Sequence, residues 1–66
     1  MDWNRVEGNW KQMKGRATEK WGKLTDDDLS QIEGKRGQLE GKIQERYGVQ
    51  KDQARKLIDE WEAGLF

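Results

Sequence analysis

The sequence predicts an all-α fold, a small bundle of three to four amphipathic helices with short connections and an approximate internal duplication. The first observation behind this is that apolar residues recur at steps of three and four, the period of one helix face. The second is that no proline occurs and the stretches between helical patterns are only a few residues long. Short links favour antiparallel neighbouring helices. The third is that the chain nearly repeats itself.

The repeat has a shift of 26 positions, from Glu7-Gly8 to Glu33-Gly34. Identical or similar residues continue to coincide at this shift: Gln12/Gln38, Met13/Leu39, Gly15/Gly41, Ala17/Ile43, Glu19/Glu45, Trp21/Tyr47, Gly22/Gly48 and Asp26/Asp52. Such self-similarity is typical of one helical unit used twice, where each copy covers an apolar stripe that the other cannot bury alone.

The first helix is expected over residues 3–21. Its apolar residues fall within an arc of about 80° when successive residues are roughly 100° apart; they are Trp3, Val6, Trp10, Met13, Ala17 and Trp21. Gly8, Gly15 and Gly22 project from the opposite side. Because Gly22 directly follows an aromatic residue, it is well placed as a left-handed residue that ends this helix.

The second helix is expected to begin at Thr25, a good N-cap residue. Three aspartates, Asp26, Asp27 and Asp28, fill the first turn, where negative charge favours the positive end of the helix dipole. Leu24 before the cap can pack against Leu29 as a hydrophobic staple. The apolar face then continues through Leu29, Ile32, Leu39, Ile43 and Tyr47.

Glycines lie across from this second apolar face, at Gly34, Gly37, Gly41 and Gly48. We expect Gly48 to end the helix in the left-handed conformation. A break near Gly34 or Gly37 divides the segment in the four-helix version of the prediction.

A final helix is expected after Gly48, with Gln50 in the cap position and Asp52 in the first turn. It carries Ala54, Leu57, Ile58 and Trp61, and Gly64 ends it. The bundle centre is predicted to hold one group of large residues, namely Trp10, Trp21, Leu39, Ile43 and Trp61.

Five glycines lie inside the predicted helices: Gly8, Gly15, Gly34, Gly37 and Gly41. Each costs about 1 kcal/mol relative to alanine, so together they cost roughly 5 kcal/mol, comparable with the net stability of a small domain. Three interpretations stay open. Some glycines mark kinks or close crossings, as the spacing of Gly37 and Gly41 allows; or the helices are kept weak so that their order depends on conditions; or a partner helix docks on the glycine face.

Composition and motifs argue against an enzyme. The 66 residues hold no cysteine and no histidine, so they lack thiolate and imidazole ligands and the usual base at neutral pH. Ser30 is the only serine and has no histidine to activate it. Asp26, Asp27 and Asp28 lack the ligand spacing of an EF-hand loop, and residues 34–37 fail the phosphate-loop pattern. We therefore predict no catalytic, cofactor-binding or metal-binding residue and no small-molecule substrate.

Charge and hydropathy bear on partners and location. The chain has 13 basic and 13 acidic residues, and a neutral surface suits phosphate binding poorly. Nevertheless, a small helical nucleic-acid-binding module is retained as the alternative function, using Lys11, Lys14, Lys35, Lys42 and Arg46. No apolar run is long enough for a signal peptide or a membrane span, so a cytoplasmic location is expected. We expect a monomer, with self-association through Trp3 and Phe66 as the other option.

Four segments carry a family resemblance: residues 9–15 (NWKQMKG), 21–28 (WGKLTDDD), 32–36 (IEGKR) and 41–48 (GKIQERYG). They resemble the CsbD-like family of small bacterial stress proteins, and the likeness covers residues 7–62. The resemblance implies a cytoplasmic, all-helical bacterial protein induced in general or osmotic stress, with no established catalytic residues and no agreed molecular activity. Residues 63–66 depart from the polar tails of close relatives. The glycine content and mean hydropathy of −1.28 also resemble the hydrophilins, by composition alone.

The sequence as a whole thus predicts a single CsbD-like helical domain over residues 1–66. The leading hypothesis is a non-enzymatic stress-response protein that acts as a soluble protectant or interaction module. Its weak helices would shift toward order as water activity falls or a partner binds.

Overall fold

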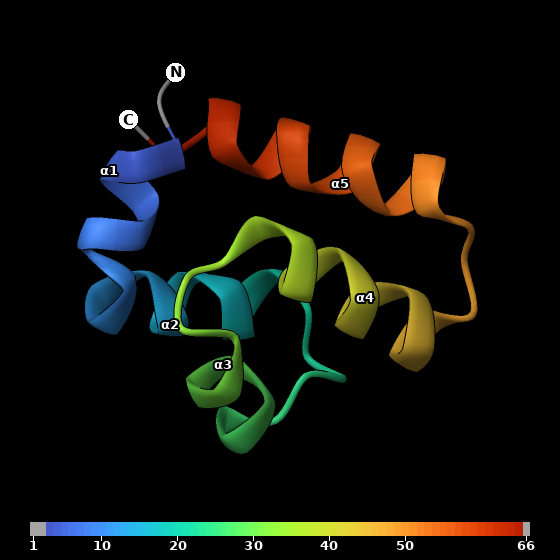
Figure 1. The fold of residues 1–66 in the computed structure, drawn as a ribbon, viewed down its shortest axis with the longest axis horizontal. Helices are drawn as coiled ribbons and strands as arrows, with labels where there is room; N and C mark the ends of the chain where they lie inside the picture. The colour runs from blue at the N-terminus through green and yellow to red at the C-terminus, as the bar shows by residue number, and fades with distance from the viewer. Residues whose placement is uncertain (1–2, 66) are drawn as a thin grey trace.

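The computed structural model describes residues 3–65, which form five helices and, within that range, no strand (Figure 1). The all-α class is confirmed, although the number of helices is five and not three to four. The helices are α1 (Trp3–Gly8), α2 (Trp10–Lys20), α3 (Asp26–Ile32), α4 (Arg36–Tyr47) and α5 (Lys51–Ala63).

The helices pack mainly against their neighbours along the chain. The most extensive pairing is between α4 and α5, and α3 packs against both α2 and α4. In Figure 1, α5 lies across the top, α4 runs beneath it and α3 lies at the bottom. The start of α1 lies beside the end of α5, so these two helices, far apart in the sequence, meet.

The helix boundaries follow the sequence repeat. Shifting α2 by 26 positions gives residues 36–46, which lie within α4, and shifting α3 gives residues 52–58, which lie within α5. The N-cap residues of α2 and α4, Asn9 and Lys35, are also 26 positions apart. The positions of the helices therefore support the predicted duplication.

The expected single helix over residues 3–21 is wrong at Asn9, which separates α1 from α2. Asn9 leaves helical geometry with φ −112° and ψ 26°. Its side-chain Nδ2 donates a hydrogen bond to the carbonyl oxygen of Arg5 at 2.9 Å, which ends α1 by competing for a helical acceptor. On the other side of this bend, Trp3 Nε1 donates to the Gly34 carbonyl oxygen at 2.7 Å.

The predicted break near Gly34 is confirmed, and it occupies residues 33–35 between α3 and α4. Glu33 and Gly34 both adopt left-handed conformations, with φ of 54° and 81°. The expectation that Gly34 faces away from the core is wrong, because Gly34 is buried. A Cβ atom there would lie 3.0 Å from the Cα atom of Glu7, so both the conformation and the close approach require glycine.

The predicted start of α3 is confirmed as a capping box. The Thr25 hydroxyl oxygen accepts from the Asp28 backbone N–H at 3.1 Å, and the Asp28 carboxylate accepts from the Thr25 N–H at 3.2 Å. Leu24 and Leu29, the expected staple residues, are both buried. Local sequence therefore determines this helix start.

The predicted helix ends are confirmed at two glycines and wrong at one. Gly48 is left-handed with φ 67° and ends α4, and Gly64 directly follows the last residue of α5. Gly22 is not left-handed. The chain leaves α2 one residue earlier, at Trp21 with φ −122°, so Gly22 lies in the following turn. Gln50 is the N-cap of α5 as expected, although its side chain makes no capping hydrogen bond.

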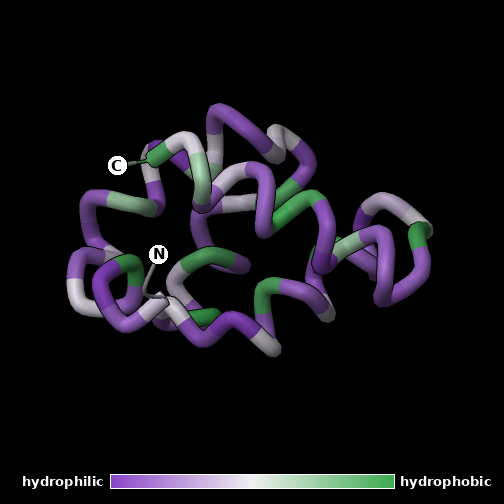
Figure 2. Tube along the Cα trace, turned by 90° about the horizontal axis from the view of Figure 1, so that it is seen from above, coloured by the Kyte–Doolittle hydropathy of each residue, from purple (hydrophilic) through white to green (hydrophobic). Residues whose placement is uncertain are grey.

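The core consists of the predicted apolar stripes. All five residues placed at the bundle centre are buried: Trp10, Trp21, Leu39, Ile43 and Trp61. Figure 2 shows that hydrophobic stretches of the trace are short and are separated by hydrophilic ones. The Trp21 and Trp61 rings meet edge to face with centroids 5.0 Å apart, and Trp10 Nε1 donates to the Leu29 carbonyl oxygen at 2.8 Å.

Candidate functional site

The first polar cluster, the Asp28 cluster, consists of Thr25, Asp28, Lys42 and Arg46 and joins α3 to α4. The Arg46 guanidinium donates through Nε and Nη2 to the two Asp28 carboxylate oxygens, each at 3.2 Å. Lys42 Nζ lies 3.5 Å from the same carboxylate. The hydrogen bond from Arg46, followed by that from the Thr25 N–H, lowers the pKa of Asp28 to about 2.

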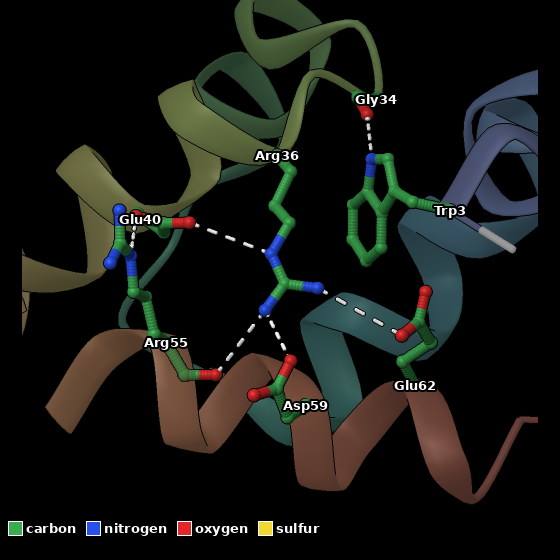
Figure 3. Close-up of polar contacts among 7 residues, drawn as sticks. All are labelled: Trp3, Gly34, Arg36, Glu40, Arg55, Asp59 and Glu62. Carbon is green, nitrogen blue, oxygen red and sulfur yellow. Dashed lines mark hydrogen bonds and ion pairs between the residues drawn. The ribbon is translucent and has the colours of Figure 1, made fainter. Parts of the chain in front are cut away.

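The second, the Arg36 cluster, consists of Arg36, Glu40, Asp59 and Glu62 and joins α4 to α5 (Figure 3). Arg36 Nε lies 3.5 Å from Glu40, Nη1 lies 3.8 Å from Glu62, and Nη2 donates to the Asp59 carboxylate. The guanidinium also lies over the Trp3 ring, 5.5 Å from its centroid. Although desolvation opposes it, the hydrogen bond and charge of Asp59 raise the pKa of Arg36.

Both clusters direct their charges toward groups of the same chain. Asp28 is only 5% exposed and Glu40 and Glu62 are buried, and each of these carboxylates meets a cation from another helix or from the next turn. Apart from Oε2 of Glu62, which has no hydrogen-bond partner, these groups pair with one another. They therefore hold helices together and leave little capacity for an external ligand. We therefore interpret both clusters as polar contacts that stabilise the packing of neighbouring helices.

The structure does not gather the candidate nucleic-acid residues into one positive surface. Lys42 and Arg46 belong to the Asp28 cluster, and Lys14 Nζ donates to the Ser30 hydroxyl at 3.1 Å and lies 4.0 Å from Asp26. Lys11 and Lys35 are exposed on α2 and at the start of α4. Three of the five cations thus face carboxylates, which weakens the potential available to phosphates.

The aromatic residues serve the core. Burial of Trp10, Trp21 and Trp61 confirms the prediction that these side chains pack internally. Trp3 is partly buried and lies beside Trp61, with ring centroids 6.2 Å apart. Phe66, the other residue named for self-association, lies outside the described residues.

The three aspartates singled out in the sequence have a structural role. Asp26, Asp27 and Asp28 form the first turn of α3, as expected for capping, and no group of three or more potential ligands in this range could hold a metal ion. In the same range, none of the five helices combines the length and the apolar character that a bilayer span requires.

An open hollow of about 370 Å³ lies between the end of α2 and the end of α5. Its apolar lining comes from Trp61 and Leu65, and charges of both signs surround it, from Arg16, Glu19, Lys20 and Glu60. Neither charge sign dominates its lining, because two of these residues are basic and two are acidic.

Three glycines inside helices, Gly15, Gly37 and Gly41, have no packing role. Gly15 in α2 and Gly41 in α4 are equivalent in the repeat, and both are exposed. Apart from the adjacent residues and the backbone of their own helix, no described atom lies within 4 Å of the position that a Cβ would take. The same open surroundings at Gly37 show that the interpretation of a close crossing at Gly37 and Gly41 is wrong. The kink interpretation holds for Gly8 and Gly34, which lie at the two breaks.

Two buried polar atoms within residues 3–65 also lack partners. They are Nε1 of Trp21 and Oε2 of Glu62. A buried polar group without a hydrogen bond costs about 1–3 kcal/mol. Like the exposed glycines, these atoms lower the stability of a domain that is already small.

Sequence reasoning missed both charge clusters. Only the pairing of Arg36 with Glu40, four residues apart on one helix, had a local signal. The other pairs join different helices, such as Asp28 with Arg46 and Arg36 with Asp59, and their prediction needs the packing of α4 against both neighbours.

Comparison with known proteins gives a consistent family assignment. The CsbD-like family profile matches residues 4–56. A UPF0337 protein of Rhodopseudomonas palustris is 75% identical over 61 residues, which cover 92% of each chain. A UPF0337 protein of Rhizobium meliloti is 74% identical over 61 residues, 92% of this chain and 88% of the relative. The UPF0337 protein YjbJ of Escherichia coli is 64% identical over 62 residues, 94% of this chain and 90% of the relative.

Proposed function

Because the chain belongs to the CsbD-like family, we propose that it is a non-enzymatic, cytoplasmic protein of the bacterial stress response that acts as a protectant or interaction module. Its single domain, residues 1–66, holds its helices near the limit of stability, and they become more ordered as water activity falls or a partner binds. The observation that carries this proposal is the pair of exposed, uncrowded glycines at Gly15 and Gly41.

The loss of helix stability that Gly15 and Gly41 cause could be avoided by alanine. Alanine fits at both positions without touching a described neighbour, and it favours a helix by about 1 kcal/mol at each site. A domain with a net stability of about 5 kcal/mol or a little more gives up a large fraction of it in this way. Close packing within the chain does not require these glycines, so two of the interpretations remain: an advantage of weak helices, on which this proposal rests, and the docking of a partner helix on the glycine face.

The first test measures stability. The double variant Gly15→Ala/Gly41→Ala is expected to raise the free energy of unfolding by about 2 kcal/mol, because the two sites lie on different helices and their effects add. Urea denaturation followed by circular dichroism measures it. The matched control is Gln12→Ala/Gln38→Ala, a repeat-equivalent pair of exposed helical positions where the change is a few tenths of a kcal/mol.

The second test addresses the function. A labile enzyme is dried and rehydrated with the wild type, the alanine variant, the glutamine control or an unrelated helical domain of similar size. Wild type and glutamine control are expected to preserve more activity than the alanine variant, because stabilised helices expose less of their apolar stripes to a partner during drying. Recovery with the wild type no better than with the unrelated domain would refute the proposal.

A further inference from the structure

The connection between α3 and α4 is the most strained segment that the structure describes. It comprises residues 33–35, and Glu33 is the only non-glycine residue in the described chain with a positive φ. Gly34 follows with φ 81° and lies against the backbone of Glu7. Two successive left-handed residues, the first of them carrying a side chain, make this turn costly to hold.

The sequence on either side of this turn is in phase for one continuous helix. Ile32, Arg36 and Leu39 are four and three residues apart, and the buried stripe runs through α3 and α4 with helical spacing. If residues 33–35 became helical, the apolar face would continue without a shift. Such a helix over residues 26–47 would be about 33 Å long, longer than the 27 Å extent of the closed molecule.

We propose that the turn at residues 33–35 is a hinge through which two copies of this chain exchange their α4–α5 halves and form a domain-swapped dimer. The partner surface is the one that already joins the halves within one molecule. It includes the Asp28 cluster, the Trp21–Trp61 ring pair and the hydrogen bond from the Lys23 N–H to the Tyr47 hydroxyl. These contacts re-form between copies. Straightening loses the bond from Trp3 to Gly34, the turn bond from the Lys35 N–H to the Ile32 carbonyl oxygen and the contact of Gly34 with Glu7.

Gly34 sets the balance between the two forms. In the closed form it tolerates φ 81° and the close approach of Glu7, whereas within a straight helix glycine is disfavoured roughly fivefold relative to alanine. Short, strained hinges favour exchange between copies. The glycine therefore keeps the chain monomeric, and this device is independent of the protectant role proposed above.

The first test is Gly34→Ala, which disfavours the closed turn and favours the straight helix. We expect the dissociation constant of the dimer to fall by about 100-fold or more, roughly tenfold for each of the two hinges. Size-exclusion chromatography with light scattering measures it across protein concentrations. Gly41→Ala is the matched control because it strengthens α4 without touching the hinge, and it is expected to leave the monomer–dimer balance unchanged. A folded Gly34→Ala variant that stays monomeric at about 1 mM would overturn the proposal.

The second test distinguishes exchange from ordinary surface association, and it remains informative if Gly34→Ala fails to fold. One copy carries Asp28→Arg and the other carries Arg46→Asp, so each alone places like charges together in the closed form. In a mixed swapped dimer one interface regains opposite charges and the other is native. Native mass spectrometry is expected to show the mixed dimer at least about tenfold above the statistical ratio. A statistical ratio, or no mixed species after the two copies are refolded together, contradicts the exchange.

Discussion

At the scale of single residues, Asp28 shows how one short side chain serves several contacts at once. Its carboxylate completes the capping box with Thr25 and accepts two hydrogen bonds from Arg46. The capping role could be predicted, because it depends on residues three apart. The pairing with Arg46 could not, because the two residues are 18 apart and meet only when α3 packs against α4.

The low pKa of Asp28 predicts a specific acid sensitivity. The pKa is about 2 in the folded chain against 3.8 for the ordinary carboxyl, so the folded state holds its proton less tightly. The resulting stabilisation is complete above about pH 4 and is lost as the pH falls through 2. Asp28→Asn is expected to flatten the decline of the free energy of unfolding between pH 4 and 2, as measured by urea titrations.

Asp27→Asn is the control for this prediction. Asp27 is the exposed neighbour in the same first turn of α3, and its substitution should leave the acid dependence close to that of the wild type. Equal slopes for the wild type and Asp28→Asn would show that the Asp28 cluster does not govern acid unfolding.

At the scale of the elements, helix starts and ends were predictable where a local device exists. Thr25 and Gly48 act as expected because a capping box and a left-handed C-terminal glycine are properties of a few adjacent residues. The break at Asn9 was missed because the apolar stripe continues through it. Its signal lay in the repeat, since Asn9 corresponds to Lys35, which follows the predicted break at Gly34.

The start of α3 provides a test at this scale. Thr25→Ala removes the hydroxyl that accepts from the Asp28 N–H, and we expect the free energy of unfolding to fall by about 1 kcal/mol. Thr18→Ala is the control, because Thr18 is exposed in the interior of α2 and donates only to the Lys14 carbonyl oxygen. Thermal denaturation of both variants would compare them; a similar loss for the two would argue against the capping box as the source.

At the scale of the whole molecule, α4 is the helix that connects the rest. It packs against α3 and α5, and each polar cluster includes residues from it. The sequence predicted the apolar centre of the bundle correctly, because burial follows the periodicity of each helix. The Asp28 and Arg36 clusters could not be predicted, because their ion pairs depend on which helices become neighbours and at what angle.

Substitution of Arg36 tests how strongly the ion pairs of the Arg36 cluster stabilise the fold. Arg36→Met keeps an unbranched side chain over Trp3 but leaves Glu40, Asp59 and Glu62 without their shared cation. We expect the free energy of unfolding to fall by about 1–3 kcal/mol. Arg16→Met, at an exposed position on α2, should change it by less than about 0.5 kcal/mol. Urea denaturation that finds the two variants equal would remove Arg36 from this role.

The contact between α1 and α5 has a consequence for synthesis. A chain is made from its N-terminus, so Trp3 and Trp21 emerge well before Trp61, the ring that both of them meet. Until Trp61 has left the ribosome, the tryptophan group is incomplete and the nascent chain carries unmatched aromatic surface. The native bundle is therefore completed only once α5 has emerged, and it does not form progressively, helix by helix.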